Sequence, residues 1–126
     1  MTEDMTMVAE AMLAAYAESI NAADADGLAE LWWLDDQRCS AIEDSIAEPI
    51  SGSVYADVLK RVHRRDQPGD HLRWRDIRCH RLGPDVGYVT ALQRYDERWR
   101  RVTLILLKKG AEWGILHSHI SAMPTE

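Results

Sequence analysis

The feature of this sequence that most constrains its fold is a change of pattern near His71. Before His71, apolar side chains recur every three or four positions, which is the spacing of amphipathic helices. After it come four runs rich in Val, Ile, Thr, Trp and Tyr, separated by turns short enough for antiparallel hairpins. The runs are residues 71–82, 86–95, 99–108 and 113–122. Helices followed by such a sheet predict an α+β fold, with the helices packed on one sheet face.

Three helices are predicted before the sheet. The first has one apolar stripe, the second is short and follows a run of turn-forming residues, and the third begins near Gly52. Residues 39–42 are predicted to form a short strand, and residues 43–50 a loop. The apolar stripe of the first helix consists of Met5, Val8, Met12, Tyr16 and Ile20, and that of the second of Leu28, Leu31, Trp32 and Leu34.

Size and charge narrow the class of protein. A chain of 126 residues fits one globular domain spanning residues 1–126 and buries enough surface to fold without a metal or a disulfide. The formal net charge of -6 repels phosphate backbones, so we expect no nucleic-acid partner. The arginines between positions 61 and 81 do not change this, because aspartates are interleaved with them.

Two cysteines and the N-terminal residues bear on location. Cys39 and Cys79 lack the spacing of a zinc or redox motif, and we expect two reduced thiols, although one bridge is arithmetically possible. The first residues are acidic where a signal peptide would be basic, and no apolar run approaches the roughly twenty residues of a membrane span. The sequence therefore predicts a cytoplasmic protein with no membrane partner.

Two segments resemble a known superfamily. Residues 16–28 read Tyr-Ala-Glu-Ser-Ile-Asn-Ala-Ala-Asp-Ala-Asp-Gly-Leu, and residues 113–124 read Trp-Gly-Ile-Leu-His-Ser-His-Ile-Ser-Ala-Met-Pro. The first resembles the first helix and turn of the nuclear transport factor 2-like superfamily, in particular its ketosteroid isomerase branch. The second is similar to the ending of SnoaL-like proteins and of the association domain of calmodulin-dependent kinase. The resemblance implies a cone of three helices and a curved mixed sheet, commonly dimeric through the outer sheet face.

The superfamily hosts isomerases, dehydratases, cyclases and hydrolases beside non-catalytic modules, so the resemblance does not fix the chemistry. By resemblance, Tyr16 is a donor that stabilises an oxyanion at the floor of the pocket. The alternative is that Tyr16 is a core residue whose hydroxyl bonds to a backbone carbonyl. The two carboxylates of steroid isomerisation have no counterpart, because residues 39–42 and Thr103 stand at their places. Steroid isomerisation is therefore not expected.

Strand alternation suggests which side chains face the pocket. Thr90, Leu92 and Arg94 share one face of their run, and by resemblance that face looks inward, with Arg94 holding a carboxylate or enolate near the mouth. A solvated arginine at a strand end is the alternative. Thr103 and Ile105 are placed inward on the next run.

Trp74 and Asp76 share a face of the first run, which would supply an aromatic wall and a general base. An ion pair of Asp76 with a nearby arginine is the alternative. Of Trp32 and Trp33, one is expected in the core and one at the rim of the pocket.

The last run carries two histidines. His117 and His119 lie two apart and so share one face, while by resemblance the opposite face, with Leu116 and Ser118, lines the cavity. We therefore place both histidines on the outer sheet face, at a dimer interface or in a surface network. No third ligand accompanies them, so no metal is predicted. A shift of the register by one residue would reverse this assignment.

Two functions remain open. The first is an enzyme without a cofactor, a lyase, isomerase or cyclase acting on a hydrophobic carbonyl-containing metabolite by general acid–base chemistry. The second is a non-catalytic ligand-binding or dimerisation module; a homodimer is expected in either case. An open cavity exposing Tyr16 and Asp76 would favour the enzyme, and a cavity filled by tryptophans the module. The predicted catalytic residues are Tyr16, Asp76 and Arg94, and the predicted ligand-binding residues are Trp33, Trp74, Thr90, Leu92, Thr103, Ile105, Leu116 and Ser118.

Overall fold

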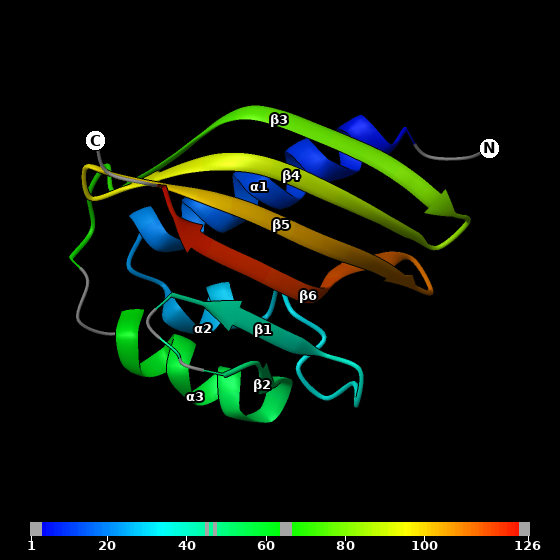
Figure 1. Cartoon of the computed structure of the whole chain (residues 1–126), viewed down its shortest axis with the longest axis horizontal. Helices are drawn as coiled ribbons and strands as arrows, with labels where there is room; N and C mark the ends of the chain where they lie inside the picture. Colours follow the sequence, from blue (N-terminus) through cyan, green and yellow to red (C-terminus); the bar gives the residue numbers. More distant parts are fainter. Residues whose placement is uncertain (1–3, 45, 47, 64–66, 124–126) are drawn as a thin grey trace.

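The computed structural model describes residues 4–44, 46, 48–63 and 67–123. Within these ranges the strands form one curved, unclosed sheet in the order β2-β1-β6-β5-β4-β3 (Figure 1). Strands β3 to β6 form an antiparallel meander, as predicted, while β1 runs parallel to β6. The strands are β1 (Ser40–Glu43), β2 (Ile50–Ser51), β3 (Leu72–Gly83), β4 (Val86–Tyr95), β5 (Arg98–Lys109) and β6 (Glu112–Ala122).

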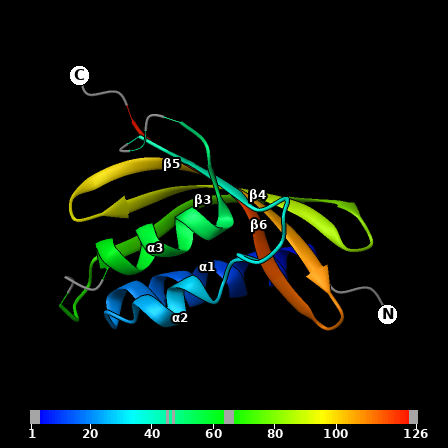
Figure 2. The same ribbon diagram turned by 90° about the horizontal axis from the view of Figure 1, so that it is seen from below.

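In the described part of the chain, three helices lie on one side of this sheet (Figure 2). They are α1 (Met5–Asn21), α2 (Ala25–Ala29) and α3 (Gly52–His63). The side chain of Asp4 caps α1 by accepting from the Thr6 backbone N–H at 2.9 Å, and Asp24 caps α2 in the same way from Gly27 N–H. The predicted α+β class is confirmed. Among the described residues, no helix is long and apolar enough to cross a bilayer.

The second helix ends at Ala29, five residues before the end that its apolar pattern suggests. The chain beyond it pairs with the edge of β6: Trp33 N–H donates to the Ile115 carbonyl at 2.9 Å, and Ile115 N–H donates to the Leu31 carbonyl at 2.7 Å. This pairing sends Trp32 and Trp33 to opposite sides, since neighbouring residues of an extended chain alternate. The structure also adds β2 at the end of the segment predicted as loop.

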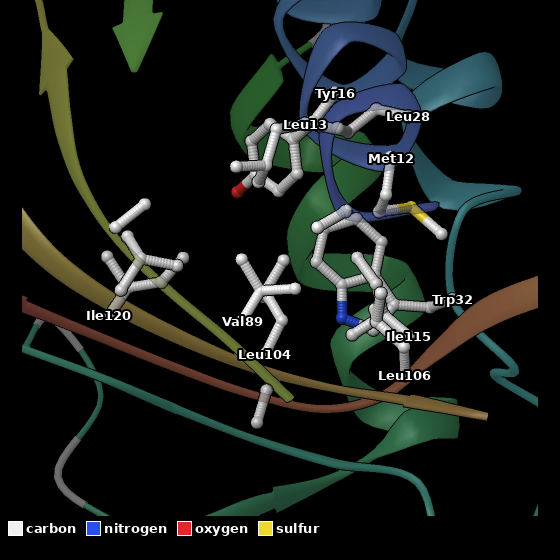
Figure 3. Close-up of a cluster of buried hydrophobic side chains, with 14 of the residues drawn as sticks. Met12, Leu13, Tyr16, Leu28, Trp32, Val89, Leu104, Leu106, Ile115 and Ile120 are labelled. Carbon is white, nitrogen blue, oxygen red and sulfur yellow. The ribbon is translucent and has the colours of Figure 1, made fainter. Parts of the chain in front are cut away.

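The core lies between α1 and the inner sheet face (Figure 3). All five apolar positions predicted for α1 are buried. They meet inner-face side chains of the sheet, with Trp32 beside Leu106 and Ile115. The largest fully buried side chains are Leu13, Leu28, Tyr55, Leu72, Val89, Leu104, Leu106, Ile115 and Ser118.

On β4 and β5, the side chains that point toward the helices are the alternate ones to those predicted. On β4 the buried positions are Gly87, Val89, Ala91 and Gln93, and on β5 they are Val102, Leu104 and Leu106. The residues of β4 and β5 that were predicted to face inward therefore face the other way, because shifting a strand by one residue moves every side chain to the other face. Thr90, Leu92, Arg94, Thr103 and Ile105 lie on the sheet face that the helices leave open.

Among the described residues the pairing is irregular at three places on β3 and β6, one of them near the end of β3 between Arg81 and Gly83, and the other two change which residues face the helices. On β3, Asp76 and Ile77 together oppose Ala91, and Asp76 has a φ of 54°. On β6, the pairing skips Leu116, because Ile105 pairs with His117 and Leu106 with Ile115. Both Ile115 and Ser118 therefore face the helices although three positions separate them.

Candidate functional site

Tyr16 lies inside a packed aromatic cluster. Its side chain is 3% exposed, and its ring centroid is 5.4 Å from that of Trp32 and 5.2 Å from that of Trp74. Burial raises the pKa of its hydroxyl, and the nearby Glu43 carboxylate raises it further, while the Gln93 side chain lowers it. The phenol is therefore held in its neutral, proton-donating form.

Gln93 places an amide beside this phenol. It is 2% exposed on the inner face of β4, and its Nε2 has no hydrogen-bond partner among the described residues. Across the sheet it is directly opposite Arg100 of β5. A buried donor without a partner is costly in a folded protein. Gln93 and Arg100 are thus neighbours on adjacent strands, and both lower the pKa of the Tyr16 hydroxyl.

Tyr55 and Glu43 form the second polar pair of the cone. Tyr55 projects from α3 and is 1% exposed, and its hydroxyl donates to Oε1 of Glu43 at the end of β1. Burial, followed by the proximity of Tyr16 and Glu43, raises the pKa of Tyr55 well above its usual value.

A cavity of about 260 Å³ opens beside Glu43. It lies where β1 and β6 end and β5 begins, so its walls come from three adjacent strands. Glu43 therefore stands between a buried phenol and a solvent-filled pocket, with Arg100 in the same wall. The guanidinium of Arg100 also lies 5.4 Å above the Tyr95 ring. The lining residues are Glu43, Asp44, Arg98, Arg100, Ile120 and Ala122.

This arrangement pairs a proton acceptor with a fixed positive charge. A carboxylate that already accepts one hydrogen bond keeps lone pairs free to take a proton from a ligand. A guanidinium in the same pocket stabilises negative charge that develops on a ligand oxygen. Among the described residues, no three His, Cys, Asp or Glu side chains gather as a metal site.

Two of the predicted catalytic residues lie outside the cone. Asp76 is on the β3 bulge with its side chain 67% exposed, 3.7 Å from the Nε of Arg75. Arg94 is exposed and lines a surface cavity of about 330 Å³ together with His71 and Asp96, whose side chains lie 2.9 Å apart. The expectation that Asp76 and Arg94 face an inner cavity is wrong, because a bulge turns the first away and the strand phase turns the second.

The two tryptophans predicted to bind a ligand, Trp74 and Trp33, lie in different places. Trp74 faces the helices as expected, but its Nε1–H donates to the Leu13 carbonyl at 2.8 Å and its ring packs on Tyr16, so it forms no open wall. Trp33 lines a cavity of about 720 Å³ between α2 and α3, with the Lys109 ammonium 4.8 Å above its ring. Trp32 is the core tryptophan and Trp33 the one at a rim.

On β6, Ser118 faces the helices as expected and is completely buried, whereas Leu116 sits at the bulge and is partly buried against the core. The histidines lie on the outer side, as expected. His117 is half-buried, with its Nδ1 2.8 Å from the Ser40 Oγ, and His119 is exposed. Partial burial and the neighbouring His119 lower the pKa of His117.

Four residues of the site were not expected from the sequence: Glu43, Tyr55, Gln93 and Arg100. Tyr55 has the spacing of an apolar helix position, so its hydroxyl gave no distinct signal. Gln93 does give a signal, because it continues the buried series of Val89 and Ala91, and a buried amide needs hydrogen-bond partners. Glu43 is the last residue of β1, one position beyond the strand predicted over residues 39–42, so it fell in the segment predicted as a loop.

A family model described as the SnoaL-like domain matches residues 9–126. No curated protein sequence is significantly similar to the chain. The match leaves out only the first eight residues of the 126.

Solved structures are similar across nearly the whole chain. A nuclear transport factor 2-like protein of unknown function from Shewanella oneidensis has a TM-score of 0.77 at 16% identity, covering 94% of this chain and 99% of the other. A putative ketosteroid isomerase from Parabacteroides distasonis has a TM-score of 0.74 at 16% identity, with coverages of 92% and 88%. A putative calcium/calmodulin-dependent protein kinase type II association domain from Thiobacillus denitrificans has a TM-score of 0.70 at 15% identity, with coverages of 91% and 94%. At these identities the likeness concerns the fold.

Proposed function

We propose a function from the premise that this chain belongs to the SnoaL-like domain family, within the nuclear transport factor 2-like superfamily. The function is general acid–base catalysis on a small carbonyl-containing metabolite, as an isomerase, lyase or cyclase. The observation that carries the proposal is the position of Glu43, which accepts from the buried Tyr55 hydroxyl and lines the pocket at the end of the cone.

In the proposed reaction, the Glu43 carboxylate takes a proton from the carbon next to the carbonyl of the substrate. The electron pair of the broken C–H bond moves onto the carbonyl oxygen, and the Arg100 guanidinium stabilises the resulting enolate. Protonated Glu43 then returns the proton to another carbon in an isomerase, or to a leaving group in a lyase. No cofactor is needed for either sequence.

Tyr16 keeps its proposed role as a second donor. Because burial raises its pKa, it donates a hydrogen bond without ionising. A substrate oxygen that reaches the Tyr16 hydroxyl would take the place of the Gln93 side chain beside it. Ile120 gives the pocket an apolar wall that suits a hydrophobic substrate.

A second function has one observation in its favour. Trp32, Trp74 and Tyr16 fill the inside of the cone, as expected for a non-catalytic module. Such a module, and equally the enzyme, would dimerise through the open sheet face, where Leu92 and Ile105 are only half-buried. We also propose a reducing, cytoplasmic location, since Cys39 and Cys79 are free thiols.

The test uses cyclohexanone as a hydrophobic carbonyl probe and cyclohexanol as its control without a carbonyl. In D₂O, the protein should speed the loss of the α-proton signal of cyclohexanone in ¹H NMR above the buffer rate. Glu43→Gln should abolish this gain while leaving the melting temperature within a few degrees, and Glu48→Gln, at an exposed position, should not. Stabilisation by cyclohexanone without any proton exchange would favour the module. The absence of both stabilisation and proton exchange would overturn the proposal.

A further inference from the structure

The inner face of β4 carries one buried hydrogen-bond donor that the packing of the cone does not use. The side chain of Gln93 is 2% exposed, and among the described residues its Nε2 has no hydrogen-bond partner. A buried amide donor without an acceptor lowers the stability of a folded protein, so its presence calls for an explanation. Binding a ligand is one explanation, because residues that serve a site are often kept at the expense of stability.

The register of the sheet places Gln93 in line with the cavity beside Glu43. Gln93 pairs with Arg100 of β5, and Arg100 pairs with Ala122 of β6. Directly opposite residues of antiparallel strands point to the same face of the sheet, so these three side chains form one row. Arg100 and Ala122 line the cavity, and neighbouring strands are about 4.8 Å apart. Gln93 is therefore one strand spacing beyond the cavity wall.

Arg100 adds a cation to this row. Its side chain is half-buried, and its guanidinium lies 5.4 Å from the centroid of the Tyr95 ring. Tyr95 follows Gln93 by two positions and so shares its face of β4, which means that the guanidinium leans toward the strand that carries the amide. Among the described residues, Arg100 has no ion pair. An amide donor and a guanidinium therefore occupy neighbouring strands without an acceptor between them.

The two acidic residues of the cavity have donors of their own. Glu43 accepts from the Tyr55 hydroxyl, and Asp44 accepts from the backbone N–H of Ala122. Neither carboxylate needs the donors of Gln93 and Arg100, which remain available for a ligand. The cavity lining also includes two arginines beside these two carboxylates, so its formal charge is balanced and does not exclude an anion.

We propose that the Gln93 Nε2 and the Arg100 guanidinium together bind a carboxylate group of the substrate, which is therefore a hydrophobic keto acid. This inference rests on the proposed function, because it uses the same cavity and the same base. A carboxylate only accepts hydrogen bonds and can accept from both donors at once. The guanidinium has five N–H donors, enough to hold the carboxylate and also stabilise an adjacent enolate oxygen. The carboxylate contact that the sequence suggested for Arg94 is then made by Arg100.

The experiment compares cyclohexanecarboxylate with cyclohexanecarboxamide, which has nearly the same shape and no charge. In isothermal titration calorimetry, the unaltered protein should bind the carboxylate on the order of tenfold more tightly than the carboxamide. Gln93→Met keeps the length of the side chain and should weaken carboxylate binding roughly tenfold, the size of one hydrogen bond to a charged group, and carboxamide binding by less. Arg100→Gln should abolish the preference for the carboxylate, and Arg94→Gln, at an exposed position, should not. Equal affinity of the unaltered protein for both probes would overturn the inference.

Stability gives a second readout, which a structural role of the amide would move in the opposite direction. Gln93→Met should raise the melting temperature of the free protein by a few degrees, because it removes an unpaired buried donor. Gln93 also lowers the pKa of Tyr16, so the comparison is repeated in the Tyr16→Phe background, where no phenol loses a partner. If Gln93→Met lowers the melting temperature in both backgrounds, the amide is structural and the inference is overturned.

The two proposals fail separately. If Glu43→Gln leaves the α-proton exchange of cyclohexanone intact, the proposed function fails, and carboxylate binding that depends on Gln93 and Arg100 still establishes the anion subsite. If Glu43→Gln stops the exchange and carboxylate binding does not depend on Gln93, only this inference fails.

Discussion

The indole Nε1–H of Trp74 donates to the backbone carbonyl of Leu13 at 2.8 Å and so joins the start of β3 to the middle of α1. The same ring meets Tyr16 edge-on, with an angle of 82° between the ring planes. Trp74→Phe keeps an aromatic side chain but removes the donor. We expect the free energy of unfolding to fall by about 1–2 kcal/mol, from one hydrogen bond and some lost contact area. Urea unfolding followed by circular dichroism measures it, and an unchanged midpoint would show that this bond contributes nothing.

Gly114 makes room for Trp33. A Cβ at position 114 would stand 2.6 Å from both Cε2 and Nε1 of the Trp33 ring, which is closer than atoms can approach. Gly114→Ala should therefore displace the indole, break its 2.7 Å bond to the Leu107 carbonyl, and lower the free energy of unfolding by about 1–3 kcal/mol.

The control for this prediction is Gly83→Ala, whose added methyl would lie 3.3 Å from the Val86 Cγ1, a contact that a small shift relieves. Both variants add the same atom to a strand glycine, so the difference between them isolates the clash. In the background of Trp33→Leu, the cost of Gly114→Ala should largely vanish in thermal melts. Equal costs in both backgrounds would contradict the assignment.

The hairpin order, the helix stripe of α1 and the α+β class could be predicted because each depends on local spacing. The phase of β4 could not be predicted in the same way. Its two faces carry Val89 and Ala91 on one side and Thr90 and Leu92 on the other, so both are apolar enough to be buried. Which one meets the helices depends on the whole sheet, and the hydrophobic pattern alone does not separate them.

The bulges explain the remaining errors in the site. Strict alternation from Trp74 places Asp76 inward, but the extra residue on β3 and the positive φ of Asp76 turn its side chain outward. On β6, alternation counted back from Ser118 places Leu116 inward, and the bulge replaces it there with Ile115. No local pattern marks either bulge, because a bulge depends on how two strands fit together.

Tyr16 and Tyr55 should not ionise while the protein is folded at moderately alkaline pH. Burial is the main cause that raises the pKa of both hydroxyls, and the nearby Glu43 raises each of them further. A spectrophotometric titration at 295 nm should show these two phenols ionising only together with alkaline unfolding. Tyr16→Phe and Tyr55→Phe should each remove amplitude from that late phase alone. Loss of amplitude from the early phase instead would contradict the packing of the cone.

Stability should depend on pH through His117. Its pKa is lowered in the folded state, mainly by burial, so below about pH 6.5, the ordinary value for histidine, the unfolded chain binds more protons than the folded one. The free energy of unfolding should therefore fall as the pH drops through and below that value. His117→Gln should flatten the slope between pH 7.5 and 5.5 in urea titrations, and His80→Gln, at an exposed position, should not. Equal slopes in all three proteins would exclude His117 as the cause.

The turn between β4 and β5 can be improved without touching the site. Asp96 and Glu97 both have positive φ, 48° and 71°, which matches a two-residue hairpin turn that favours glycine at its second position. Glu97→Gly removes the conformational penalty of a side chain in this region and should raise the free energy of unfolding by up to about 1 kcal/mol. Glu97→Ala keeps a Cβ, so it should change little. Asp96 is left in place because its Oδ1 lies 2.9 Å from the His71 Nδ1. If Ala stabilised the hairpin as much as Gly in thermal melts, the gain would come from removing the Glu97 charge and not from the backbone.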